Sequence, residues 1–160
     1  MQNLSGYRPE KPKDGSSFEA FRYNGVVSIE KAIVSENTRI NSEFYPMGCK
    51  QLDIEAIVMD PKSPFIGRKL WKRFNLDSEK EDKNGKTPAQ KLADQLFAVG
   101  LTFIDEESLD KALAELVTLD VVIKAYPADF KDGRDKFQMW NMKGRASDVV
   151  TKPNQSTIAF

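Results

Sequence analysis

The segment Lys50–Val58 constrains the fold most strongly, because apolar and polar residues alternate along it. Leu52, Ile54, Ala56 and Val58 are apolar, whereas Gln51, Asp53 and Glu55 between them are polar. Alternation with a period of two is typical of a β-strand that buries one face and exposes the other. The sequence therefore predicts a strand here with one buried face and one polar face.

Other segments carry the composition of strands or the start signals of helices. β-Branched residues favour strands, and Thr87, Pro88 and Gln90 form the N-terminal capping pattern of a helix that Gly100 is suited to end. A second helix is expected from near Asp105. In chain order we expect strands over 25–34, 50–58 and 65–76, helices over 88–99 and 105–117, and strands over 119–126 and 136–142.

This order predicts a mainly β fold with helices. Five strands with a helical insertion between the third and the fourth is the order of the OB-fold, a five-stranded Greek-key barrel. Three consecutive strands without helices argue against simple α/β alternation, and an open α+β sheet is the alternative. We expect an irregular N-terminal arm over 1–20, an OB-fold-like domain over 21–145 and a C-terminal tail over 146–160.

Composition excludes several kinds of chemistry. The 160 residues include 24 basic and 24 acidic side chains, no histidine and one cysteine, Cys49. An intrachain disulfide, a Cys/His zinc site and histidine-dependent hydrolysis are therefore excluded within one chain. We expect no enzyme activity, no cofactor and no bound metal, and a carboxylate-dependent metal nuclease has the least support.

The segment 65–76, FIGRKLWKRFNL, gathers four basic and three aromatic residues without an acidic one. On a strand, Lys69, Trp71 and Arg73 point to one side, and Leu70 and Phe74 point to the other. An exposed tryptophan between two cations suits single-stranded nucleic acid, since the ring stacks on a base and the cations contact phosphates. Core packing of Trp71, with basic residues that protect a sheet edge, is the competing interpretation.

Other residues extend this candidate site. Arg68 and Lys72 fall on the core side of the strand by parity, and the direction of Lys72 is the first to check. The two loops expected to flank the face add aromatic and basic residues, and the last strand adds a tryptophan that we expect near the same surface. These residues are Arg39, Phe44 and Tyr45 in the first loop, Phe130, Lys131 and Arg134 in the second, and Trp140.

The segment 67–76, GRKLWKRFNL, resembles a motif of a bacteriophage family whose members are regarded as single-stranded DNA-binding proteins and were long described only as a domain of unknown function. The resemblance continues through 89–93 and 98–100 to the Lys-Asp-Gly-Arg segment at 131–134, and covers roughly residues 22–145. It implies non-enzymatic DNA binding by an OB-fold-like domain, with no catalytic residues to transfer.

The predicted function is binding of single-stranded DNA without sequence preference, during phage DNA replication or recombination. RNA as a ligand, an oligomer, and recombination or replication proteins of phage or host as partners stay open at this point. The alternative is an OB-like adaptor domain that binds a protein partner. No apolar run approaches the roughly 20 residues of a membrane helix, and the polar N-terminus lacks a secretion signal, so we expect no membrane association and a cytoplasmic location in the host cell.

Overall fold

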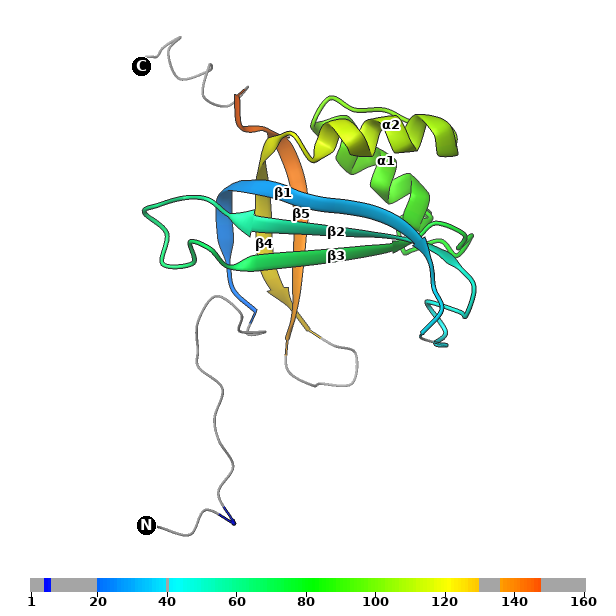
Figure 1. Cartoon of the computed structure of the whole chain (residues 1–160), viewed down its shortest axis with the longest axis horizontal. Helices are drawn as coiled ribbons and strands as arrows, with labels where there is room; N and C mark the ends of the chain where they lie inside the picture. Colours follow the sequence, from blue (N-terminus) through cyan, green and yellow to red (C-terminus); the bar gives the residue numbers. More distant parts are fainter. Residues whose placement is uncertain (1–4, 7–19, 40, 130–135, 148–160) are drawn as a thin grey trace.

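The computed structural model describes residues 5–6, 20–39, 41–129 and 136–147. These residues form one antiparallel sheet and two helices (Figure 1). In chain order the elements are β1 (Tyr23–Glu36), β2 (Lys50–Val58), β3 (Lys69–Asn75), α1 (Pro88–Ala98), α2 (Glu106–Leu116), β4 (Asp120–Ala128) and β5 (Phe137–Arg145). The predicted order of strands and helices is confirmed, and both predicted ends of the second strand match β2.

The sheet has the strand order β3-β2-β1-β4-β5, with β1 at its centre. The C-terminal part of β1 pairs with β2, whereas its N-terminal part pairs with β4. A register shift between Ile29 and Lys31 marks a bulge in β1 close to this change of partner. As a result, β4 and β5 run across the β1–β2–β3 layer (Figure 1).

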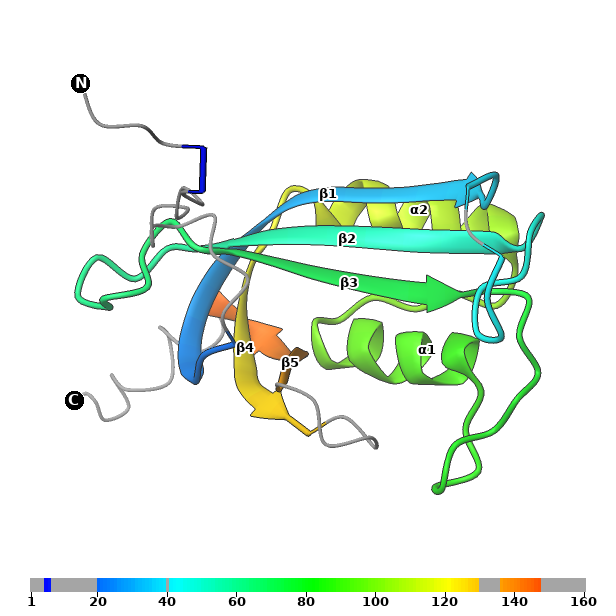
Figure 2. The ribbon, with the colours of Figure 1, turned by 90° about the horizontal axis from the view of Figure 1, so that it is seen from below.

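The structure is a five-stranded antiparallel open sheet with two helices, so the mainly β class is confirmed. In the part of the chain that the structure describes, β3 and β5 are the two edges and share no ladder of backbone hydrogen bonds. α1 packs against both edges and lies alongside β3 (Figure 2).

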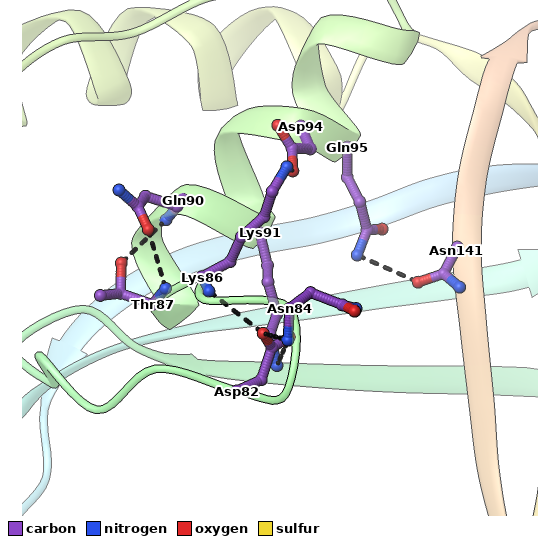
Figure 3. A network of polar contacts seen from close by, with 9 residues as sticks. All are labelled: Asp82, Asn84, Lys86, Thr87, Gln90, Lys91, Asp94, Gln95 and Asn141. Carbon is purple, nitrogen blue, oxygen red and sulfur yellow. Dashed lines mark hydrogen bonds and ion pairs between the residues drawn. The ribbon is translucent and has the colours of Figure 1, made fainter.

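Helix α1 begins as its sequence predicts. The Thr87 side chain accepts a hydrogen bond from the Gln90 amide, and the Gln90 side chain accepts one from the Thr87 amide. Lys91 forms an ion pair with Asp82 at 3.2 Å in the preceding loop (Figure 3). Because the first amides of a helix have no intrahelical partner, this capping fixes the position at which α1 starts.

One apolar core lies between the helices and the inner face of the sheet. α1 contributes Leu92 and Leu96, and α2 contributes Leu109, Leu113 and Leu116. Burying each such side chain contributes about 1.5–3 kcal/mol. The sheet contributes Val27, Ile29, Leu52, Ile54, Ala56, Val58, Leu70, Phe74, Val121 and Ile123. The opposite face of β1, β2 and β3 lies outside this core and carries mostly polar residues, together with the exposed side chains of Ile33 and Trp71.

Candidate nucleic-acid interface

The outer face of β3 carries the three residues that its alternation predicts. Lys69, Trp71 and Arg73 are exposed, whereas Leu70 and Phe74 are buried in the core. The Trp71 side chain is 48% exposed, which is high for the largest apolar residue. The part of the competing interpretation that packs Trp71 in the core is therefore wrong, whereas its other part, basic residues on a sheet edge, agrees with the position of β3 at one edge.

Antiparallel pairing places two carboxylates of β2 opposite these residues. Asp53 pairs with Arg73, and Glu55 pairs with Trp71. Arg73 Nε donates to Asp53 Oδ1 at 2.6 Å, and the Trp71 indole nitrogen donates to Glu55 Oε1 at 3.1 Å. Lys69 Nζ lies 3.9 Å from Glu55 Oε2. The face therefore combines cations, carboxylates and an aromatic ring rather than cations alone.

Sequence reasoning missed Asp53 and Glu55 as members of this surface. Along the chain, residues 65–76 hold no acidic residue, whereas the two carboxylates lie beside this segment only across the sheet. The signal was present in the alternation of β2, whose outward positions include both carboxylates. Only the pairing of β2 with β3 brings them beside Trp71 and Arg73.

The β1–β2 connection packs beside the end of β3, as predicted for the first flanking loop. The Tyr45 hydroxyl donates to the Arg73 carbonyl at 3.0 Å, and the Arg73 guanidinium lies 5.6 Å from the Tyr45 ring. Burial raises the pKa of Tyr45, although the charge of Arg73 acts in the opposite direction. These contacts join Tyr45 to the same surface as Trp71.

Phe44 is 59% exposed, and the amine of Lys80 lies 5.0 Å from the centre of its ring. The Asn75 side chain donates to the Phe44 carbonyl at 2.8 Å and so ties this part of the loop to β3. Arg39 is exposed in the same connection.

On β1, Ile33 is exposed and pairs with Asp53, which extends the face by an apolar residue that sequence reasoning missed.

Arg68 does not lie on the outer face of β3. Its guanidinium carbon is 4.4 Å from the centre of the Phe21 ring and 5.9 Å from that of Phe65. Parity places Arg68 on the core side of the strand, and cation–π contact with these rings explains how a charged group is accommodated there. Arg68, although named as a candidate site residue, therefore does not share the outer face with Lys69, Trp71 and Arg73.

Lys72 points inward, as parity predicts, and reaches the gap between β3 and β5. Its amine donates to the Trp140 carbonyl and lies 5.3 Å from the Trp140 ring and 5.5 Å from the Phe74 ring. Burial, with a smaller contribution from the charge of Lys91, lowers the pKa of Lys72 to about 8. Lys72 thus belongs to the contact between the two edge strands and not to the outer face.

Trp140 was expected near the same surface as Trp71, but the structure buries it. The side chain is 1% exposed, and its indole nitrogen donates to the Trp71 carbonyl at 3.0 Å. The face of β5 that carries Trp140 and Met142 is the face covered by the core. Its ring is therefore unable to stack on a ligand at the surface.

The second predicted loop, with Phe130, Lys131 and Arg134, lies outside the described residues.

Cys49 is buried, as expected for a small apolar side chain. Within the described ranges, no three histidine, cysteine, aspartate or glutamate side chains gather in a way that could hold a metal ion. Neither helix of the described chain has the length and apolar character needed to cross a membrane.

No family model matches the chain, and the searches of curated proteins and of solved structures found no match.

Proposed function

We propose that this chain binds single-stranded DNA on the outer face of β1, β2 and β3. The observation that carries the proposal is the half-exposed ring of Trp71, which lies between Lys69 and Arg73 on a face that Tyr45 extends. Stacking of a base on an aromatic ring contributes about 1–3 kcal/mol, and every base offers a ring. Such a surface binds single strands with little preference for sequence.

The sheet is proposed to be an OB-type fold. In that fold a five-stranded, partly open barrel presents strands 2 and 3, and the loop between strands 1 and 2, to oligonucleotides. The order β3-β2-β1-β4-β5, the helices between β3 and β4 and the position of Trp71 all support this assignment. The resemblance of 67–76 to the phage single-stranded DNA-binding family supports a role in DNA replication or recombination.

The carboxylates on the face are compatible with this proposal because their ion pairs are exposed. Solvent-exposed ion pairs contribute about 0–1 kcal/mol each. Arg73 and Asp53 are both partly exposed, at 37% and 42% of their side chains. Phosphate groups can therefore replace Asp53 as the partner of Arg73 at a cost smaller than the gain from stacking one base.

Fluorescence anisotropy of a labelled oligo-dT, titrated at several salt concentrations, tests the proposal. We expect binding that weakens as salt rises, because contacts to phosphates release counterions. Trp71→Ala should weaken binding by about 1–3 kcal/mol, the range for one stacked base. Phe97→Ala is the matched control, because Phe97 is an exposed aromatic residue on α1. A wild-type protein that does not bind at low salt would show the proposal to be wrong.

A further inference from the structure

We propose that Asp53 and Glu55 set the affinity of the outer face through two different actions. Asp53 competes with phosphate for Arg73, and Glu55 orients the Trp71 ring for stacking. The inference rests on the proposed function, because it names residues that tune the same surface. It starts from the three contacts that join these carboxylates to β3.

In the absence of a ligand, Asp53 is the ion-pair partner of Arg73. The contact is short, at 2.6 Å, and joins two side chains that solvent reaches. Arg73 also lies against the Tyr45 ring, so its guanidinium is held close to the aromatic part of the face. A phosphate that binds Arg73 must either displace the Asp53 carboxylate or use the other guanidinium N–H groups beside its negative charge. Asp53 consequently lowers the affinity for any polyanion.

Glu55 is more deeply placed, with only 17% of its side chain exposed. Its register positions it between Lys31 on β1 and Trp71 on β3. One carboxylate oxygen accepts the hydrogen bond from the indole nitrogen, and the other faces Lys69. The bond holds the nitrogen edge of Trp71 toward β2. A ring that is oriented before binding loses less conformational freedom when a base stacks on it.

Substituting Glu55 with glutamine or with alanine separates the effect of its negative charge from its effect on the orientation of the Trp71 ring. Glu55→Gln keeps an oxygen that can accept the indole hydrogen bond and removes the negative charge. Glu55→Ala removes both, so Trp71 loses its partner. We expect Glu55→Gln to bind oligo-dT more tightly than the wild type does, and Glu55→Ala to bind less tightly than Glu55→Gln.

The binding experiment compares these variants and Asp53→Asn with the wild type, using labelled oligo-dT at low and high salt. Asp53→Asn should raise the affinity roughly two- to fivefold, the equivalent of its exposed ion pair with Arg73, and less at high salt. Glu55→Gln should also raise the affinity, because it removes the negative charge beside Lys69. Asp110→Asn is the control for net charge, because Asp110 is exposed on α2, which packs on the opposite face of the sheet. It should leave the affinity nearly unchanged.

Iodide quenching of tryptophan fluorescence tests, without DNA, whether the Glu55 carboxylate lies beside the Trp71 ring. Trp140 is buried, so quenching by a dissolved ion reports on Trp71. Glu55→Gln should raise quenching by the anion iodide relative to quenching by neutral acrylamide, since the nearest negative charge is removed. The same ratio in Asp110→Asn should equal that of the wild type.

Three outcomes are distinguished by this design. A wild-type protein that does not bind oligo-dT overturns the proposed function. If the wild type binds and loses affinity on Trp71→Ala, but Asp53→Asn and Glu55→Gln bind like Asp110→Asn, the inference about the carboxylates is overturned and the proposed function stands. Equal binding by Glu55→Gln and Glu55→Ala would overturn the orienting role of Glu55 alone.

Discussion

At the scale of single residues, neighbours on β3 have opposite surroundings. Trp71 lies on the outer face with Glu55 as its partner, whereas Lys72 points inward to the Trp140 carbonyl. A buried amine that contacts a neutral carbonyl and two rings has lost much of its hydration. This explains why the pKa of Lys72 falls to about 8. The position of Lys72 therefore makes the stability of the fold depend on pH.

We expect stability to rise from about pH 8 upward because of Lys72. Its pKa is about 8 in the folded chain and 10.5 as the ordinary value. Between these values the unfolded chain holds the proton that the folded chain has released, so raising the pH favours folding. Each unit of pKa depression corresponds to about 1.4 kcal/mol.

Lys72→Met has no such proton, so its free energy of unfolding should lack this rise. Urea unfolding of both proteins at pH 7, 8, 9 and 10 measures the difference. The stability of the wild type relative to Lys72→Met should increase across the series. Parallel curves for the two proteins would contradict the assigned surroundings of Lys72.

At the scale of elements, α1 protects the exposed edge of β5. The Gln95 side chain accepts a hydrogen bond from the Met142 amide and donates one to Asn141 at 3.2 Å (Figure 3). Arg145 in turn donates to the Val99 carbonyl at the end of α1. Unpaired edge strands invite association with other chains. α1 therefore covers the core and also satisfies a backbone amide of an edge strand.

Removing the N-terminal cap of α1 should destabilise the whole domain. Thr87→Ala loses the side chain that accepts from the Gln90 amide, and such a loss typically costs about 1 kcal/mol. The measurement is the midpoint of urea unfolding at neutral pH. Thr102→Ala serves as a control, because Thr102 is an exposed threonine between the two helices. It should change stability by no more than about 0.5 kcal/mol.

At the scale of the whole molecule, side chains join the two edges of the sheet. The Lys72 amine donates to the carbonyl of Trp140, and the Trp140 indole donates to the carbonyl of Trp71. Each edge strand thus supplies a side chain that satisfies a backbone acceptor of the other strand. These two reciprocal hydrogen bonds hold β3 beside β5 without a ladder of backbone hydrogen bonds. They fix the inner side of β3, the strand that carries Trp71 on its outer face.

The two tryptophans should consequently respond differently to the same substitution. Trp140→Phe removes the indole donor to the Trp71 carbonyl and leaves space in the core, so we expect a loss of stability of about 1–3 kcal/mol. Trp71→Phe changes an exposed ring and should alter stability by about 0.5 kcal/mol or less. Urea unfolding of the two variants makes the comparison. Similar losses in both would contradict the assigned roles.

The sequence by itself determined the elements and the two faces of β3. Capping by Thr87, alternation in β2 and the outward positions of Lys69, Trp71 and Arg73 depend on local geometry, because a strand repeats every two residues. Signals of this kind depend only on residues that lie within a few positions of one another in the sequence. They therefore predicted the order of the elements and the centre of the candidate site.

Only the tertiary structure decided which residues meet across the sheet. Periodicity assigns a side chain to one side of its own strand, but it does not say which strand lies beside it or which side is covered. Register placed Asp53 and Glu55 beside the basic residues of β3, and the core covered Trp140. Lys72 became a contact between the two sheet edges for the same reason: its partner lies on a strand far along the chain.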